Sequence, residues 1–317
     1  MRRWAAGGLQ GLAVAAGAGL LLALPQVATR DIVTAVFFAL IFITLAVSYD
    51  ILGGFLGYLN LGQGAFFGLA GYVLFILIVK VAFLQHLGPA GPALAVLAAV
   101  AFTALFARLA AYPLFQLRGA YFAMATFGLM LLLGHLITNL GGLTGGAYGL
   151  YIPTELYLPL RPAYTLALLL TGLSVALNAL LARSRLGMGL QAIRQSELAA
   201  AAIGIDLFRY KSRALVLSSL PSALAGCLFA LYSGYIDVQN MLGAEKTLFP
   251  VIMAMLGGSG TVFGPVLGGV IVRAIDVSLK NYLVLPVPAL GIYGLILMCI
   301  GLFMPQGILP FFLRRRL

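Results

Sequence analysis

Charge is scarce in this sequence. Only 9% of the 317 residues are Asp, Glu, Lys or Arg, whereas 62% are hydrophobic and the mean hydropathy is +1.09. A soluble domain has about a quarter of its residues charged, because water must solvate its surface. This composition excludes an ordinary soluble protein, and membrane lipid must be the solvent for much of the surface.

Acidic residues are the scarcest charged group, with 8 against 19 Lys and Arg, which gives a net charge of +11. A nucleic-acid-binding protein would gather its basic residues with aromatics on one polar face. Here they lie between apolar runs, which is typical of signals that set membrane topology. We therefore expect no nucleic-acid partner.

Residues that carry chemistry are also few. Cys227 and Cys299 both lie in apolar segments and are read as small core residues. His86 and His135 are far apart, without a carboxylate at ligand spacing. The sequence has no phosphate-binding loop and no pairing of a nucleophile with a base. We expect neither catalysis, nor a metal, nor a cofactor in this chain.

Long apolar runs dominate instead. A membrane-spanning helix needs about 20 mainly apolar residues. Segment 247–257 is too short to cross alone, and is expected to form a half-helix or one side of a re-entrant hairpin. We predict a single all-α transmembrane domain over 1–317 with about ten spans (eight to ten), at 9–28, 31–52, 62–83, 92–112, 119–139, 163–182, 212–235, 247–257, 262–280 and 287–305.

The distribution of Lys and Arg predicts the orientation. The segment 183–213 is the only long charged connection and carries six basic residues. Loops rich in Lys and Arg remain in the cytoplasm. With ten spans, this places the loop and both termini in the cytoplasm, and Lys246 in a loop on the opposite side.

Polar groups within the spans mark the next candidates. Asn60 and Gln63 are amides at membrane depth, which require a partner or a water-lined cavity. They are expected either to pack within the bundle or to line a pathway. Arg273 and Asp276 are three residues apart on one helical face, and a structural ion pair is the favoured interpretation.

The segment 183–213 also contains its own helix. Residues 188–203 are rich in helix formers, and Gly204 is suited to end the helix. One interpretation is an interfacial helix lying on the headgroups. The other is a docking element seated in a groove of a cytoplasmic partner, which the alanines favour because they allow close approach.

Four stretches of the sequence carry motifs rich in glycine or alanine. They read AIR at 192–194 with ELAAAAIG at 197–204, LNLGQGAFFGLAGY at 59–72, LRGAYFAMATFG at 117–128 with LTGGAYGL at 143–150, and MLGGSGTVFGPVLGG at 255–269. These stretches resemble the permeases of branched-chain amino acid importers, specifically the LivM type, and they occur in family order. The stretch at 192–204 resembles the coupling motif of importer permeases, and the others resemble glycine-rich and central signatures of the family.

The resemblance implies a type II importer permease of the bacterial or archaeal inner membrane. Two cytoplasmic ATP-binding subunits would hold the ATP and Mg²⁺ and dock on a coupling helix at about 187–204. The other partners would be a second homologous permease, in a heterodimer or homodimer, and an extracytoplasmic binding protein. The implied coupling residues are Arg194, Glu197, Ala200, Ala201 and Gly204.

The implied cargo is leucine, isoleucine or valine, carried by alternating access. Polar residues of the matching segments are candidates for the pathway, namely Asn60, Gln63, Thr126 and Thr144. Urea, short amides and other amino acids remain open as cargo. An ion-coupled secondary transporter is the rival class, but only Asp50 and Asp276 offer carboxylates near membrane depth.

Overall fold

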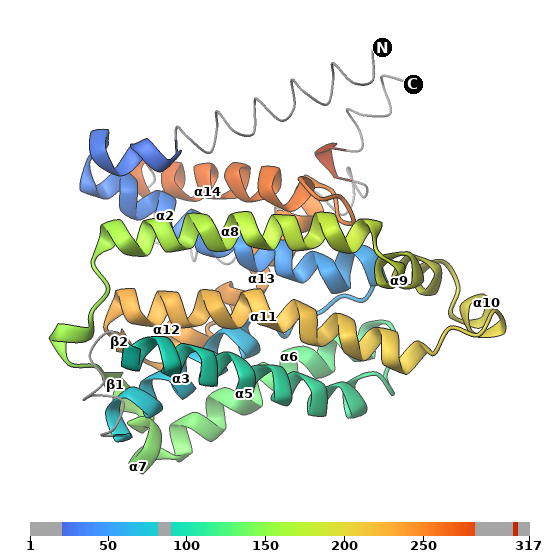
Figure 1. The fold of residues 1–317 in the computed structure, drawn as a ribbon, viewed down its shortest axis with the longest axis horizontal. Coiled ribbons are helices and arrows are strands. Elements are labelled where there is room, and N and C mark those ends of the chain that lie inside the picture. Colours follow the sequence, from blue (N-terminus) through green and yellow to red (C-terminus); the bar gives the residue numbers. More distant parts are fainter. Residues whose placement is uncertain (1–20, 82–89, 283–306, 310–317) are drawn as a thin grey trace.

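The computed structural model describes residues 21–81, 90–282 and 307–309. Within them the chain forms a bundle of long helices (Figure 1). The elements are α2 (Arg30–Asp50), η1 (Ile51–Leu56), α3 (Gln63–Lys80), α5 (Ala90–Leu114), α6 (Ala120–Asn139), α7 (Gly141–Thr144), η2 (Gly146–Tyr148), β1 (Leu150–Tyr151), η3 (Thr154–Leu156), α8 (Leu160–Arg183), α9 (Arg185–Gln195), α10 (Glu197–Ala202), α11 (Leu207–Ser233), β2 (Tyr235–Ile236), α12 (Val238–Leu242), α13 (Glu245–Gly257) and α14 (Gly264–Tyr282).

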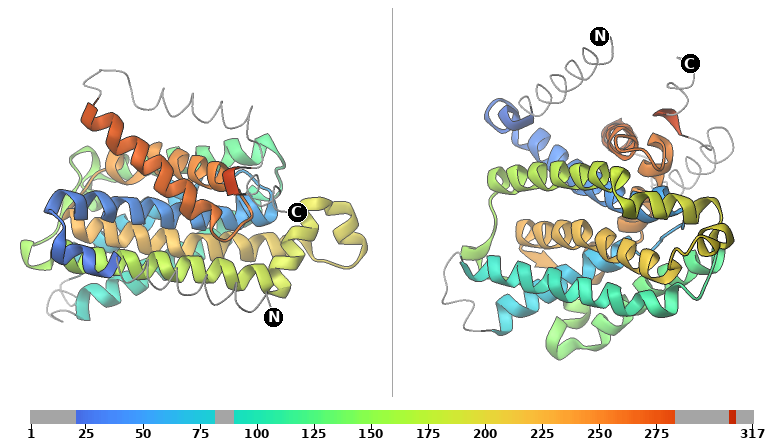
Figure 2. Two further views of the ribbon diagram at one scale, coloured as in Figure 1. Left: turned by 90° about the horizontal axis from the view of Figure 1, so that it is seen from above. Right: turned by 45° about the vertical axis from the view of Figure 1, so that its right-hand side comes forward.

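The two ends of the bundle differ. The short helices α9 and α10 project beyond the long helices at one end, called here the α9 end (Figures 1 and 2). At the other end β1 and β2 pair in an antiparallel ribbon, with Leu150 opposite Ile236 and Tyr151 opposite Tyr235. This second end is called the ribbon end. Apart from these four paired residues, the regular structure of the described chain is helical.

The helices α3 and α11 form the interior of the bundle. Both are apolar around most of their circumference, and such a helix is stable where other helices surround it. Their backbones approach closely, because a Cβ added at Gly226 of α11 would lie 2.0 Å from the carbonyl oxygen of Phe67 in α3. In contrast, α5 and α8 bury narrow stripes of small residues and expose leucines on the opposite face.

The half-helix α13 and the helix α14 form a close hairpin. A Cβ at Gly268 would lie 1.8 Å from the carbonyl oxygen of Met253, and one at Gly257 would lie 1.7 Å from that of Gly264. The glycines at 257 and 268 therefore allow the two helix backbones to approach closely. The turn of this hairpin lies at the α9 end, where the Gly260 amide donates to Asp50.

The number of spans is established only in part. Within the described residues six helices are long and apolar enough to cross a bilayer: α2 with η1, α3, α5, α6, α8 and α11. The predicted short segment at 247–257 corresponds to α13, which has 13 residues. The predicted span 9–28 falls largely outside the described residues, and 287–305 falls entirely outside them.

Candidate functional site

The segment expected to form one coupling helix forms two. Helix α9 ends at Gln195, and Ser196 begins α10 by accepting a hydrogen bond from the Ala199 amide. Ser196 has extended dihedral angles, so the helical backbone is interrupted there. Gly204 ends the second helix as predicted, with a φ of 85° that only glycine adopts readily.

The carboxylate of Glu197 is turned toward the bundle. Its Oε1 accepts hydrogen bonds from the Lys211 ammonium at 2.6 Å and from the Tyr58 hydroxyl. Lys211 also donates to the Tyr58 oxygen at 2.8 Å and lies over the Tyr58 ring. On the outer side, Arg118 Nε lies 3.7 Å from Glu197 Oε2. One side chain of α10 thus joins α11, the 57–62 segment and the α5–α6 turn.

The surroundings of Glu197 determine its ionisation. Desolvation raises the pKa of the carboxyl and is the largest single effect, but the hydrogen bonds from Lys211 and Tyr58 and the nearby cations together outweigh it. The pKa of Glu197 therefore lies below its ordinary value. Burial and the Glu197 carboxylate raise the pKa of Tyr58, so its hydroxyl remains a donor at neutral pH.

Arg194 of α9 makes a second connection into the bundle. Its guanidinium donates to the carbonyl oxygen of Gly54 in η1, the single π-helical segment among the described residues. Such segments often mark functional positions in helices. Just before η1, the buried Asp50 accepts from the Gly260 amide at 2.8 Å. Arg194 and Asp50 thus link α9, the end of α2 and the α13–α14 turn.

The remaining predicted coupling residues divide by exposure. Ala200 is buried against the bundle, whereas Ala201 and Gly204 are exposed. The large apolar side chains of Leu198 and Ile203 are 83% and 75% exposed. The outward surface of α10 is therefore apolar, while its charged residue, Glu197, faces the bundle.

Two of the predicted pathway residues form one buried network. The Gln63 amide nitrogen donates to the hydroxyls of Ser48 and Ser218, each at 3.0 Å. Asn60 donates to the Gln63 oxygen at 3.4 Å and accepts from the Gly62 amide. Both amides are fully buried. In this conformation they join α2, the start of α3 and α11.

The two predicted threonines lie in different places. Thr126 of α6 is close to the amide network, because its hydroxyl accepts from the Leu61 amide at 3.0 Å. Thr144 lies at the ribbon end, where its hydroxyl donates to the Ile137 carbonyl oxygen. The structure brings three of the four pathway candidates together and leaves Thr144 apart.

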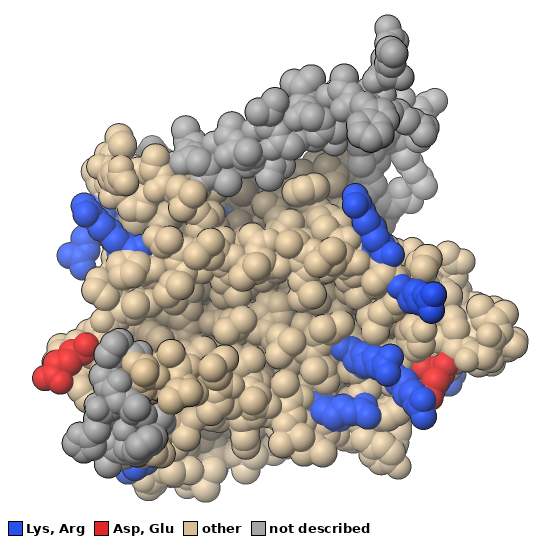
Figure 3. All heavy atoms as spheres, in the orientation of Figure 1, with Lys and Arg blue, Asp and Glu red and all other residues tan. Residues whose placement is uncertain are grey.

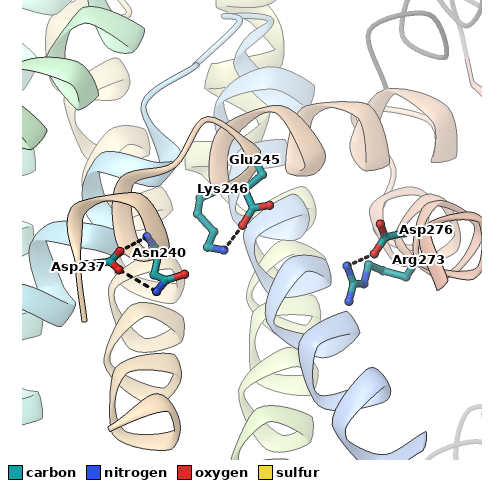
Figure 4. Close-up of polar contacts among 6 residues, drawn as sticks. All are labelled: Asp237, Asn240, Glu245, Lys246, Arg273 and Asp276. Atoms are coloured by element: carbon teal, nitrogen blue, oxygen red, sulfur yellow. Dashed lines mark hydrogen bonds and ion pairs between the residues drawn. The ribbon is translucent and has the colours of Figure 1, made fainter. Parts of the chain in front are cut away.

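Two ion pairs, called here the charge cluster, have their cations beside the ring of Phe42. The Arg273–Asp276 pair is present, with 2.6 Å between Nη1 and Oδ2, which confirms the ion pair predicted from the sequence. A second pair joins Lys246 to Glu245 at 2.5 Å. Lys246 Nζ and Arg273 Cζ each lie 5.2 Å from the Phe42 ring centroid. In Figure 4 the two pairs lie on either side of the blue helix α2.

This cluster lies near the middle of the bundle. The Thr44 hydroxyl of α2 is 2.9 Å from the Thr171 hydroxyl, and Thr171 lies close to the midpoint of α8 (Leu160–Arg183). Phe42, two residues from Thr44, is therefore at about mid-depth. Charged side chains at that level are costly unless they are paired, and they commonly serve a transport path.

Sequence reasoning missed half of this cluster. Lys246 was expected in a loop outside the bilayer, but its side chain is 95% buried in the first turn of α13. Glu245 adds a carboxylate near membrane depth beyond the two expected. The sequence signal that could have revealed it is the adjacent pair of opposite charges, Glu245 and Lys246, directly before an apolar segment too short to cross the membrane. Among the described residues no His, Cys, Asp and Glu side chains group in a way that could hold a metal ion.

Comparison with known proteins decides the family. The family described as "Branched-chain amino acid transport system / permease component" matches residues 31–301. The chain belongs to this permease family. The match covers both the charge cluster and the α9–α10 segment, so the resemblance seen in four separate stretches extends over nearly the whole chain.

Curated relatives of this permease carry related names. The high-affinity branched-chain amino acid transport permease LivM of Escherichia coli K12 is 26% identical over 92% of this chain and 73% of the relative. A probable LivM of Methanocaldococcus jannaschii is 29% identical over 39% of each chain. An autoinducer 2 import permease, LsrC of Klebsiella pneumoniae, is 30% identical over 43% of this chain and 42% of the relative. No solved structure matches.

Proposed function

We propose that this permease is the translocation subunit of an ATP-driven importer of branched-chain amino acids in the inner membrane. The observation that carries the proposal is the projecting α9–α10 segment, which exposes an apolar surface and is joined to the bundle through Glu197 and Arg194. The family match and the names of the relatives support the cargo. ATP chemistry belongs to partner subunits.

The α9 end is the cytoplasmic end in this proposal. The exposed side chains of Leu198 and Ile203 then face a groove of an ATP-binding subunit, as in helix-in-groove recognition. Glu197 does not meet the partner in this arrangement. It fixes α10 to α11 through Lys211, so that a movement of the partner displaces the bundle.

The ribbon end then faces the binding protein. It presents exposed aromatic side chains, including Tyr148 and Tyr151, which are 90% and 66% exposed. A second permease, identical or homologous, completes the pathway. These aromatic side chains offer shape and apolar area for a contact, and the exposed Glu155 and Arg161 at the same end add charges of both signs.

The charge cluster around Phe42 is the proposed passage for the cargo. An amino acid carries one ammonium and one carboxylate, and each can exchange for a member of an existing ion pair without leaving a charge unpaired. Lys246 and Arg273 offer the cations, and Glu245 and Asp276 the carboxylates. Urea lacks charges and would gain nothing from this exchange.

Reconstitution tests the proposal. The permease is purified with its native partners, placed in vesicles and supplied with labelled leucine, its binding protein and ATP. We expect uptake that requires ATP hydrolysis and is inhibited by isoleucine and valine but not by urea. Uptake driven by an ion gradient without ATP would refute the importer, and preference for urea would refute the cargo.

A variant pair tests the docking surface. Leu198→Glu introduces a charge into the proposed contact, and Tyr148→Glu places the same charge on an exposed residue at the ribbon end. We expect the first variant to lose the ATP-binding subunits on purification and the second to retain them. Equal retention would show that α10 does not contact these subunits.

A further inference from the structure

A positively charged cavity lies at the α9 end, between α5 and α11. Its volume is about 550 Å³, within the range of small-molecule sites. None of its lining residues is acidic. The lining consists of three arginines, one serine and an apolar wall: Arg108, Arg209, Arg213, Ser212, Val216, Leu217 and, from α9, Leu186.

The cavity lies beside an exposed, mainly apolar face of α5. Arg108 belongs to the exposed stripe of α5 formed by Leu105, Leu109 and Tyr112, whose exposed fractions are 57%, 66% and 68%. It precedes the last residue of α5, Leu114, by six positions, or about 9 Å along the helix axis. Arg108 is therefore inside the span but close to the headgroups.

All three arginines line the cavity, and the side chains of two of them have described contacts. Arg108 donates to Ser212 and lies 5.8 Å from the centroid of the Phe208 ring. Arg209 is paired with Asp206 at 2.9 Å, and Arg213 follows it by one helical turn. On this side of the molecule most Lys and Arg side chains lie toward the α9 end (Figure 3).

A phosphodiester fits these features best. Guanidinium groups bind phosphate oxygens through two parallel hydrogen bonds, and basic pockets between membrane helices attract anionic headgroups. The apolar wall of Val216 and Leu217 and the stripe of α5 would contact acyl chains, which a soluble anion lacks. We infer that this cavity is a binding site for one anionic phospholipid, lying beside the segment that couples to the partners.

Lipid retention tests this inference. The permease, purified with its partners, is exchanged into neutral detergent and titrated with phosphatidylglycerol, phosphatidylcholine or inorganic phosphate, and bound lipid is counted by native mass spectrometry. We expect saturable retention of one phosphatidylglycerol. Arg108→Gln and Arg213→Gln should each weaken it about fivefold. The matched control is Arg161→Gln, which removes an exposed arginine in the first turn of α8, at the ribbon end.

A second variant leaves the charges in place. Leu217→Trp fills the apolar wall, and it should expel the lipid while the complex keeps its composition. Equal retention of phosphatidylcholine, or unchanged retention in the arginine and tryptophan variants, would overturn the inference. Displacement of phosphatidylglycerol by millimolar inorganic phosphate would assign the cavity to a soluble anion. Lipid bound only after removal of the ATP-binding subunits would assign it to a protein contact.

Discussion

Removal of the Glu197 carboxylate should loosen α10 without unfolding the bundle. Lys211 is 95% buried and donates to Glu197 at 2.6 Å, so Glu197→Ala leaves a buried ammonium with the Tyr58 oxygen as its described acceptor. Loss of a charged hydrogen bond costs about 2 kcal/mol. Arg118 adds little, because its side chain is 75% exposed and 3.7 Å away.

Hydrogen exchange in α10 measures this loss directly. A cost of about 2 kcal/mol for local opening corresponds to about 30-fold faster exchange at amides such as those of Ala200 and Ile205, which are bonded within this segment. Glu197→Gln keeps an acceptor and should show a smaller effect. Glu155→Ala, an exposed carboxylate at the ribbon end, serves as the control.

The same network has a defined pH dependence. The folded-state pKa of Glu197 is lowered from its ordinary value of 4.5. Its contribution is therefore complete above about pH 4.5 and is lost as the pH falls through the lower folded-state pKa. If Glu197→Ala exchanges at the wild-type rate at pH 7, the carboxylate does not anchor α10, and a direct contact with a partner would be the better account of this residue.

Three further changes test other parts of the molecule. Gln63→Leu removes two hydrogen bonds to buried serines and should lower the melting temperature in detergent by several degrees. The exposed control Gln239→Leu should leave the melting temperature unchanged. Equal melting temperatures for the two variants would contradict the buried network. Gly268→Ala should separate α13 from α14 and abolish uptake, because the added methyl group would overlap the backbone of Met253. Gly128→Ala should leave uptake unchanged, because nothing lies within 4 Å of the added methyl group. Arg273→Leu should lower leucine uptake at least tenfold, because it removes one of the two cations beside Phe42 and the guanidinium that pairs with Asp276. Arg273→Lys should restore part of the uptake, and unchanged uptake in Arg273→Leu would exclude the charge cluster from the path.

Local features of the fold were predictable from the sequence. The Arg273–Asp276 pair follows from a spacing of three residues on one helix. Gly204 ends α10 because glycine adopts a positive φ at little cost. The shortness of α13 is visible in the length of its apolar run. Each of these depends on neighbours within a turn or two of chain.

The candidate site depended on contacts between distant segments. Glu197 was identified as a coupling residue from its motif. Its inward direction could not be predicted, because it depends on a hydrogen bond from Tyr58, which lies 139 positions away in the sequence. Lys246 was predicted in a loop and is instead buried in α13, because hydropathy cannot show that its ammonium lies over the rings of Phe42 and Phe229. The gathering of three arginines around one cavity likewise depends on how α5 packs on α11.

The sequence by itself determined the solvent, the class and the family of this protein. The sequence has too few charged residues for a surface in water, apolar runs long enough to span a membrane, and four motifs in family order. All three are properties of composition and spacing, so they can be read without a structure. The tertiary structure alone decided which way each polar side chain points. An isolated helix leaves its outward side chains free to rotate, and only the packing of α2, α11, α13 and α14 determines which charges meet within the bilayer.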